Sequence, residues 1–193
     1  MKIALIDYGA GNVQSVKYAV NRLGYDPILT KNHDEIRSAD KVIFPGVGSA
    51  KSAMNQLRQS GLDKVIPTLK QPVLGICVGM QLMAKHSQEG DVECLGIIDA
   101  KVVKFKKDLK IPHMGWNDIS DVKSDLFVHL PSESQVYFVH SYYIPLNKYT
   151  IASTDYGATF SAAIQKDNFY AVQFHTEKSG NVGEQILKQF LEL

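Results

Sequence analysis

The sequence predicts an α/β fold: a single domain with a mostly parallel central sheet, helices on both faces, and an added antiparallel section. In the first half, short apolar runs alternate with helical patterns, which is typical of a parallel sheet covered on both faces. In the second half, strand-like runs follow one another with turn residues between them, which is typical of antiparallel pairing. The length of 193 residues suits one domain with a sizeable core.

Four apolar runs in the first half are predicted strands, and helical stretches separate them. The runs are KIALI (2–6), PILT (27–30), KVIF (41–44) and VLGI (73–76). After the first run, apolar residues recur at spacings of three and four from Val13 to Leu23, which predicts a helix. We expect Asn12 to cap this helix and Gly24 to end it.

The second half is predicted to consist mainly of strands and to close with one helix. The predicted strands are CLGII (94–98), KVVKF (101–105), QVYFVHSYYI (135–144), TIAST (150–154), FSAAIQ (160–165) and FYAVQFH (169–175). Turn residues such as Tyr156-Gly157 and Lys166-Asp167-Asn168 separate the later strands. Apolar residues from Val182 to Leu191 fall on one face of a final helix. No linker or internal repeat divides the sequence, so we expect one domain over residues 1–193.

The composition argues against several classes of function. The net charge is +1, which gives no general electrostatic reason to bind nucleic acid or an anionic membrane. The run KVVKFKKDLK at 101–110 is locally basic, and we interpret it as a solvated strand or hairpin rather than a polyanion site. The first apolar run is too short for a signal peptide or a membrane span. We therefore expect a cytoplasmic protein whose two cysteines remain free thiols.

A cysteine between two glycines is the main candidate for chemistry. Gly75-Ile76-Cys77-Val78-Gly79 lies where a predicted strand gives way to a helical pattern. A strand-to-helix turn of this kind lifts the thiol clear of the sheet, and a helix N-terminus favours the thiolate. The backbone N–H of Val78 would then point toward an oxyanion on the attacked carbon. For this motif alone, a cysteine packed between glycines for steric reasons is the alternative.

His175 and Glu177 are the candidate base and its orienting carboxylate. His175 ends a predicted strand, and Glu177 follows two positions later, on the same side of an extended chain. In a parallel sheet this strand end would lie near Cys77. A structural His–Glu pair is the alternative, and it is favoured for an isolated His-x-Glu.

A glycine-rich loop could complete the site. Pro45-Gly46-Val47-Gly48 directly follows a predicted strand, and its N–H groups could turn toward an oxyanion. A simple turn before a helix is the alternative. Three such elements at strand ends favour a common site more strongly than any one of them does, because sites in open α/β sheets form there. The cysteines and histidines show no paired CxxC or HxxxH spacing, so a metal site is disfavoured.

These motifs together resemble the class I, or triad, glutamine amidotransferases. GICVGMQLM, PGVG and FHTEKS together carry this resemblance, and the cysteine and histidine motifs identify the broad family. DYGAGN, FPGVG, PHMGWN, YFVHSYY and FHTEKSG match the pattern of the glutaminase subunits of imidazole glycerol phosphate synthase; PGVG and HMGWN are the narrower markers, and the resemblance extends over residues 1–193. The chain differs from the family pattern at one position, because Thr176 stands where a proline usually separates the histidine from the glutamate.

The resemblance implies glutamine hydrolysis by a triad, without a metal or an organic cofactor. Cys77 would attack the side-chain amide of glutamine, His175 would carry the proton to the leaving ammonia, and Glu177 would orient His175. The residues implied at the oxyanion hole are Val47, Gly48 and Val78. The residues implied in binding glutamine are Gly46, Gln81, His140, Ser141 and Tyr142.

The resemblance also implies a separate partner. Ammonia would pass to a cyclase subunit with a (β/α)₈ barrel fold, in a heterodimer that makes imidazole glycerol phosphate and an aminoimidazole carboxamide ribotide for histidine synthesis. Asn12, Trp116 and Lys178 are the implied interface residues, and a buried core position is the alternative for Trp116. Two alternatives for the function stay open: a related glutaminase that supplies another synthase, such as a sugar-aminating enzyme, and a catalytically idle regulatory subunit.

Overall fold

The fold is described from a computed structural model, which covers residues 1–9, 13–106, 108–131 and 134–193. The α-helices are α1 (Val13–Arg22), α2 (His33–Arg37), α3 (Ala50–Ser60), α4 (Leu62–Val65), α5 (Val78–Leu82) and α6 (Gly180–Glu192). The 3₁₀-helices are η1 (Ile66–Thr68), η2 (Asp125–Phe127) and η3 (Thr176–Lys178). The strands of the first half are β1 (Ile3–Ile6), β2 (Ile28–Thr30), β3 (Lys41–Gly46), β4 (Val73–Cys77), β5 (His86–Ser87) and β6 (Val92–Glu93). The later strands are β7 (Lys101–Lys104), β8 (His113–Asp118), β9 (Gln135–His140), β10 (Tyr142–Tyr143), β11 (Thr150–Asp155), β12 (Thr159–Lys166) and β13 (Phe169–Val172).

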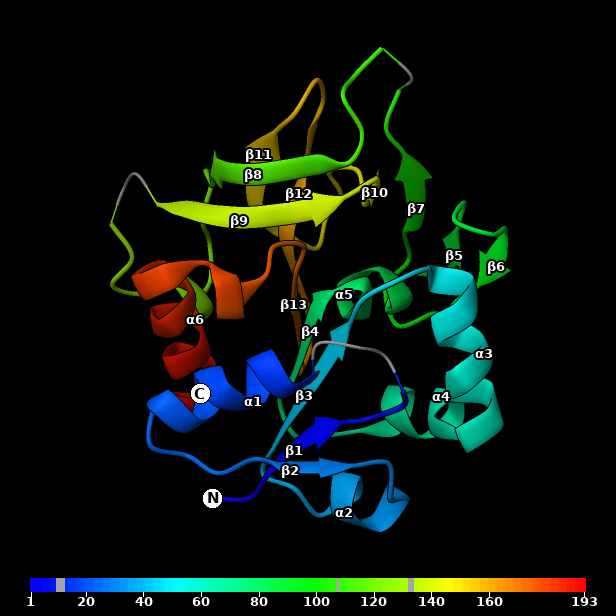
Figure 1. The fold of residues 1–193 in the computed structure, drawn as a ribbon, viewed down its shortest axis with the longest axis vertical. Coiled ribbons are helices and arrows are strands. Elements are labelled where there is room, and N and C mark those ends of the chain that lie inside the picture. Colours follow the sequence, from blue (N-terminus) through cyan, green and yellow to red (C-terminus); the bar gives the residue numbers. More distant parts are fainter. Residues whose placement is uncertain (10–12, 107, 132–133) are drawn as a thin grey trace.

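A seven-stranded sheet forms the centre of the described part of the chain, with the strand order β11-β12-β13-β4-β3-β1-β2. The strands from β13 to β2 run parallel, whereas β11 and β12 continue the sheet by antiparallel pairing. Helices α1 and α6 lie on one side of the parallel strands, and α3, α4 and α5 lie on the other (Figure 1). The predicted α/β architecture with an added antiparallel section is therefore confirmed.

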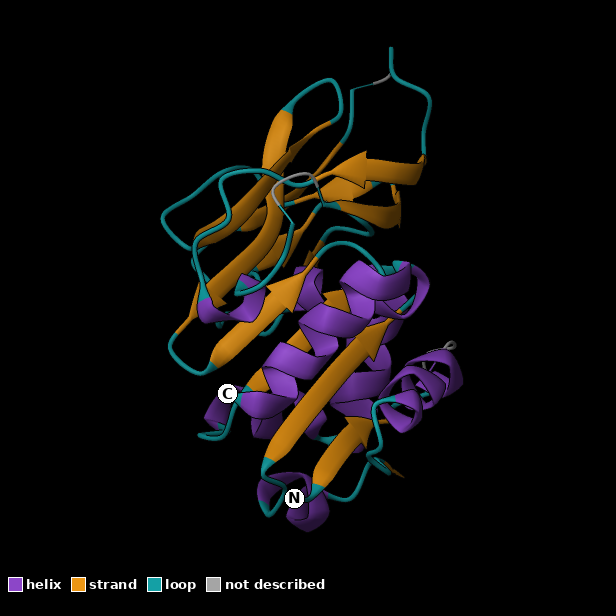
Figure 2. Ribbon diagram, turned by 90° about the vertical axis from the view of Figure 1, so that its left-hand side faces the viewer, coloured by secondary structure: helices purple, strands orange, loops and turns teal. Residues whose placement is uncertain are grey.

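The antiparallel section extends beyond this sheet. Strands β8 and β9 pair with each other, and the short strands β10, β7, β5 and β6 form a further sheet. Figure 2 shows the consequence: helices surround the sheet in the lower half, and strands make up most of the upper half. The site described below lies where the two halves meet.

The helices form where apolar periodicity predicts them. The buried residues of α1 are Val13, Val16, Ala19 and Val20, and those of α6 are Gly183, Ile186, Leu187, Phe190 and Leu191. Helix α1 ends just before Gly24, whose φ of 87° is a backbone conformation that glycine adopts at little cost. Asn12, predicted to cap α1, lies outside the described residues. No helix in the described ranges is long and apolar enough to cross a membrane.

Three predicted strands differ from the structure. Residues 94–98 do not form a strand. Gly96 bends this segment with a φ of 68°, and N–H groups of the segment donate to carbonyls at the end of α5 and just after it, as in Ile98 N to Met83 O at 2.8 Å. The predicted strand 169–175 ends at Val172. Beyond that point the chain leaves the sheet, and the N–H of His175 donates to the carbonyl of Tyr137 on β9. The predicted strand 135–144 is interrupted at Ser141, between β9 and β10.

Candidate active site

The strand-to-helix turn at Cys77 is present and strained. Cys77 ends β4 and precedes α5, with φ 54° and ψ −110°, in a region that residues with a side chain rarely adopt. A Cβ atom on Gly79 would lie 1.9 Å from the carbonyl oxygen of Phe44, and one on Gly75 would lie 3.0 Å from the backbone carbonyl carbon of Gly79. Both glycines are therefore needed for α5 to pack this closely against the sheet, and that packing holds Cys77 in its strained conformation.

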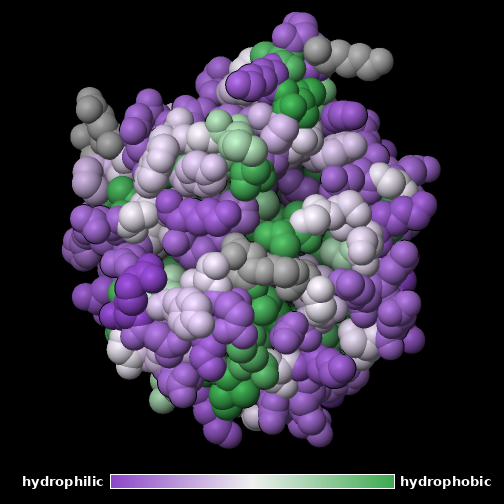
Figure 3. Space-filling model, in the orientation of Figure 1, coloured by the Kyte–Doolittle hydropathy of each residue, from purple (hydrophilic) through white to green (hydrophobic). Residues whose placement is uncertain are grey.

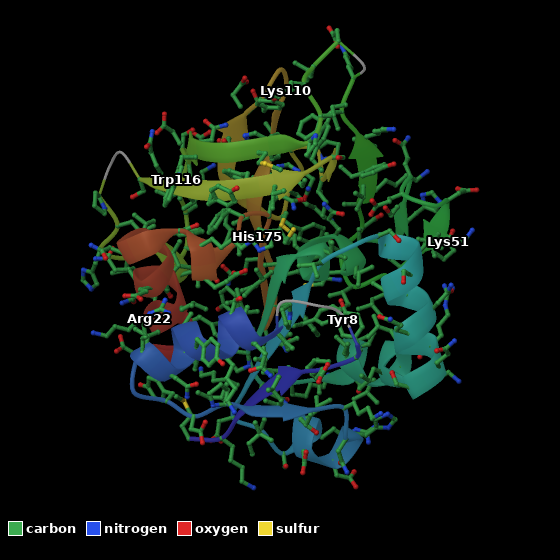
Figure 4. All side chains as sticks on the ribbon, viewed as in Figure 1. Tyr8, Arg22, Lys51, Lys110, Trp116 and His175 are labelled. Atoms are coloured by element: carbon green, nitrogen blue, oxygen red, sulfur yellow. The ribbon has the colours of Figure 1, made fainter. Side chains whose placement is uncertain are left out.

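His175 lies beside this turn because its strand is the parallel neighbour of β4. Strand β13 pairs with β4 in a register that sets Val172 against Ile76, so both chains leave the sheet at the same edge. In Figure 4, His175 lies in the middle of the molecule, between the helical half and strands β8 and β9. The predicted proximity of the two strand ends is confirmed.

Glu177 contacts His175 directly, although not through the extended geometry that the sequence suggested. His175 Nδ1 lies 2.8 Å from Glu177 Oε1, and the two side chains are 3% and 0% exposed. His175 itself is extended, with φ −89° and ψ 104°, but Glu177 belongs to η3. The turn into η3 brings the carboxylate back toward the imidazole.

The electrostatic environment favours a charged imidazole. Burial alone lowers the pKa of His175, but hydrogen bonds to Cys77 and Glu177 and the negative charges of both groups outweigh burial and raise the pKa to about 10. An imidazolium next to a sulfur stabilises the thiolate, which is the nucleophilic form of cysteine. The resting arrangement is therefore suited to nucleophilic attack.

Two glutamine side chains connect the sulfur to the neighbouring strands. Gln173 is fully buried, and its Nε2 lies 3.8 Å from Cys77 Sγ. The amide nitrogen of Gln81 donates to Gln173 Oε1 at 3.0 Å and to the carbonyl of Tyr142 at 2.9 Å. Gln173 was missed by the sequence reasoning. In an extended chain, residues two positions apart point to the same side, and Gln173 stands two positions before His175. The spacing that indicated Glu177 could therefore have indicated Gln173 as well.

A pocket of about 410 Å³ opens over the sulfur. Its walls are formed by Val47, Gly48, Cys77, Val78, Gln81, Glu89, Val139, His140, Ser141, Tyr142, His175 and Lys178. The structure thus brings together the predicted nucleophile and base, the three predicted oxyanion residues and four of the five predicted glutamine-binding residues. A larger cavity of about 830 Å³ lies beside Asp7 and Lys31. Neither Cys77 nor His175 lines it, so the smaller pocket is the candidate active site.

Gly46, the fifth predicted glutamine-binding residue, lies beneath the pocket rather than in its wall. It pairs with Cys77 across β3 and β4, and a Cβ atom on it would lie 2.7 Å from the backbone nitrogen of Gly79. Gly48 is exposed, has φ 84° and has open space where a Cβ would be. The loop thus starts at a tightly packed glycine and continues through one whose backbone is free to rotate.

Glu89 is the charged group in the pocket that the sequence did not indicate. It is half-buried, and its Oε2 accepts a hydrogen bond of 2.8 Å from the backbone nitrogen of Ala50 at the start of α3. Burial raises the pKa of the carboxyl, while the hydrogen bond from Ala50 acts in the opposite direction. A carboxylate at this position offers an acceptor for a positively charged group of a bound ligand.

The predicted interface residues that the structure describes are both at the surface. Trp116 on β8 is 55% exposed, so the alternative of a buried core tryptophan is wrong, and Lys178 is exposed at the rim of the pocket. Asn12 lies outside the described residues. Figure 3, which views the molecule as in Figure 1, shows hydrophobic residues at the surface in a band down the middle, with mostly hydrophilic residues on either side. Within the described ranges, no group of three or more His, Cys, Asp or Glu residues is arranged to hold a metal ion.

Comparison with known proteins agrees with this geometry. The family model for class-I glutamine amidotransferases matches residues 4–193. The chain belongs to the class-I glutamine amidotransferase family. It is 57% identical to an imidazole glycerol phosphate synthase subunit HisH of Bacteroides fragilis, and the match covers 100% of both chains. It is 46% identical to the subunit HisH of Buchnera aphidicola, again with 100% of both chains covered.

Solved structures of amidotransferases share the fold. A protein from Thermoplasma acidophilum described as a putative GMP synthase component superposes with a TM-score of 0.75 at 24% identity, covering 100% of this chain and 92% of that one. A structure described as a glutamine amidotransferase gives a TM-score of 0.77 at 17% identity, covering 98% and 97% of the two chains. At these identities the likeness concerns the amidotransferase fold alone.

Proposed function

We propose that this chain hydrolyses glutamine to glutamate and ammonia as the glutaminase subunit of an imidazole glycerol phosphate synthase. The proposal rests on one observation: a strained cysteine beside a buried histidine, whose pKa the cysteine helps to raise, and which is paired in turn with a buried glutamate. Nucleophile, base and orienting acid in this order are the parts of a triad for acyl transfer. Full-length relatives named as subunits of this synthase support the same assignment.

The proposed reaction follows from these positions. The thiolate of Cys77 attacks the side-chain amide carbon of glutamine, and the carbonyl oxygen becomes an oxyanion. His175 gives its proton to the departing nitrogen, which leaves as ammonia, and a thioester remains. His175 then takes a proton from water, which attacks the thioester and releases glutamate together with the thiolate. Glu177 keeps Nδ1 of the imidazole occupied, so that Nε2 performs both transfers.

The walls of the pocket supply the remaining roles. Backbone N–H groups of Val78 and of Val47 or Gly48 stabilise the oxyanion. Glu89 accepts from the α-ammonium group of glutamine. Gln81, whose amide nitrogen is already used, offers its oxygen to the substrate. The stretch from His140 to Tyr142 forms the wall against the rest of the amino acid, and Gly46 supports the oxyanion loop from below.

The ammonia passes to a separate cyclase subunit with a (β/α)₈ barrel fold, within a heterodimer. Trp116 and Lys178 face this subunit: Lys178 is exposed at the rim of the pocket, and Trp116 is a large apolar side chain left exposed on β8. The proposed location is the cytoplasm, where Cys77 stays a free thiol. A role in supplying another synthase is less well supported, since the cited relatives carry the name of imidazole glycerol phosphate synthase.

The test is glutamate release by the purified chain, alone and with the cyclase subunit. We expect glutaminase activity that depends on Cys77, and formation of imidazole glycerol phosphate when both subunits are present. The Cys77→Ala complex should still form product from free ammonium. Activity that survives the loss of Cys77 would refute the triad, and activity without any response to the cyclase subunit would refute the proposed partner.

A further inference from the structure

Two buried histidines, His113 on β8 and His140 on β9, are hydrogen-bonded to each other behind the pocket. His113 Nδ1 lies 3.1 Å from His140 Nε2, and the two residues are 4% and 6% exposed. His140 Nδ1 lies 2.8 Å from the carbonyl oxygen of Tyr142. On the far side, Asn117 Nδ2 lies 3.4 Å from His113 Nε2. These contacts form a chain from β8 to the wall of the pocket.

Backbone groups fix the direction of every hydrogen bond in this chain. A carbonyl oxygen only accepts, so His140 Nδ1 carries a proton and donates to Tyr142. In a neutral ring Nε2 is then an acceptor, so His113 Nδ1 donates to it. Asn117 is oriented by its donation to the carbonyl of Asp155 and by its acceptance from the N–H of Asp118, both at 2.9 Å. Its amide nitrogen therefore faces His113 and donates, and both histidines are in the Nδ1–H tautomer.

The surroundings keep both rings neutral. His113 stacks on Tyr156 with ring centroids 4.0 Å apart and on Phe138 at 4.9 Å, and Phe105 packs against both imidazoles. Burial lowers the pKa of His113 to about 4 and that of His140 to about 3. At neutral pH every hydrogen bond therefore runs in the same direction, from Asn117 through His113 and His140 to the carbonyl of Tyr142.

Both ring nitrogens of His140 are used inside the protein, although the residue lines the pocket. Its imidazole therefore has no polar atom left for glutamine. What it holds is the carbonyl of Tyr142, which also accepts from the amide nitrogen of Gln81. With two donors on one carbonyl, a shift of His140 would change the position of Gln81 and, through Gln173, the contact with the sulfur.

We infer that His113 is a positioning residue of the glutamine pocket, acting through His140 on the carbonyl of Tyr142 and thereby on Gln81. This inference rests on the proposed function, because it concerns the same pocket. It assigns His113 a role that requires a donor at Nδ1 and not only an aromatic ring of the right size. A substitution that removes the N–H donor and keeps the aromatic ring distinguishes the hydrogen-bonding role from the packing role.

The decisive pair of variants is His113→Phe and His113→Asn. Phenylalanine keeps the stacking on Tyr156 but leaves His140 Nε2 buried without a donor, whereas asparagine places an N–H close to the position of Nδ1. In the Cys77→Ala background, calorimetric titration with glutamine should show about tenfold weaker binding or more for the phenylalanine variant, since an unpaired buried acceptor is costly. The asparagine variant should bind within about threefold of the background. His129→Asn, an exposed histidine elsewhere, is the control.

A measurement on the unmodified chain keeps the inference testable if the phenylalanine variant does not fold. In protein labelled with ¹⁵N-histidine, we expect a scalar coupling between His113 Nδ1 and His140 Nε2 across their hydrogen bond, and neutral shifts for both rings down to pH 5.5. The opposite tautomer, or titration of either ring above pH 5.5, would overturn the inference. So would unchanged glutamine affinity in a folded His113→Phe variant. A Cys77→Ala chain that binds no glutamine, alone or with the cyclase subunit, refutes the proposed function first.

Discussion

His175 Nδ1 lies 2.8 Å from Glu177 Oε1, and the two side chains are 3% and 0% exposed. A contact of this kind holds the imidazole in one orientation and one tautomer, while in the proposed reaction the sulfur of Cys77 performs the attack. The loss of Glu177 and the loss of Cys77 are therefore expected to differ in how much they lower the rate.

Glu177→Gln should reduce glutamine hydrolysis less than Cys77→Ala does. Loss of the orienting acid in a comparable triad costs roughly 10⁴ in turnover, and loss of the nucleophile roughly 10⁶. The measurement is glutamate release in the presence of the cyclase subunit, with Glu184→Gln on the surface of α6 as a control. Equal losses for the two variants would mean that Glu177 has a second role, in holding η3 in place.

Replacing Cys77 by alanine should lower the pKa of His175. In the resting site the pKa is about 10, because the hydrogen bonds and charges of Cys77 and Glu177 outweigh burial. The variant removes one of the two groups that raise it, whereas burial still lowers it, so the titration midpoint should move down measurably. The check is an NMR titration of ¹⁵N-histidine. An unchanged midpoint would show that Glu177 alone raises the pKa.

A glutamine-like diazoketone should label Cys77 and spare Cys94. Burial raises the pKa of the Cys94 thiol to about 12, so this group stays protonated and unreactive near neutral pH. Peptide mapping of the adduct identifies the labelled residue, and Cys94→Ser should retain full labelling. Dominant modification of Cys94 would contradict the assignment of the nucleophile.

Val47→Pro should remove most of the stimulation by the cyclase subunit and leave a low basal rate. Beyond the tightly packed Gly46, the exposed Gly48 leaves the loop free to turn a backbone N–H toward or away from an oxyanion, and proline at position 47 has no N–H to offer. One oxyanion donor contributes about 10²–10³ in turnover, so stimulation should be of that order and should appear in kcat more than in KM. Val47→Ala, which keeps the N–H, is the matched control. Undiminished stimulation in a folded proline variant would exclude this switch.

Thr176→Pro should stabilise the protein without changing its activity much. Thr176 opens η3, a position that suits proline, and the residue before it is extended, as a following proline requires. The hydroxyl of Thr176 is also buried, and among the residues that the structure describes it has no hydrogen-bond partner. We expect a gain of about 0.4–1 kcal/mol in the free energy of unfolding, measured with denaturant. Thr176→Val replaces the hydroxyl by a methyl group without restricting the backbone, and so separates the two contributions, whereas a loss of stability in the proline variant would contradict the argument.

The parts of the fold that alternate between apolar strands and amphipathic helices could be predicted from the sequence. Their periodicity reflects burial on both faces of the sheet, so VLGI and FYAV were placed correctly and brought Cys77 near His175. Strand β8 could not be found in this way. Its inward residues include His113 and Asn117, and its outward residues include Met114 and Trp116, which reverses the usual pattern of apolar residues inside.

The candidate site was predictable where its residues follow one another closely and not where they meet through tertiary structure. The Cys77 turn and the His175–Glu177 pair are local motifs. Glu89, by contrast, lies in the turn between β5 and β6 and reaches the pocket only because Ala50 at the start of α3 binds its carboxylate. No local pattern encodes such a contact.

The position of β13 has a consequence for when activity can arise. This strand lies between β12 and β4, so the segment that carries the proposed base must be inserted beside the strand that carries the proposed nucleophile. A chain still being synthesised has made Cys77 long before it has made His175, and pairing across so many residues forms late. A growing chain therefore exposes β4 without its neighbour and holds a cysteine without a base. Hydrolysis of glutamine begins only once synthesis has passed the C-terminal strands, which spares the cell's glutamine from unfinished chains.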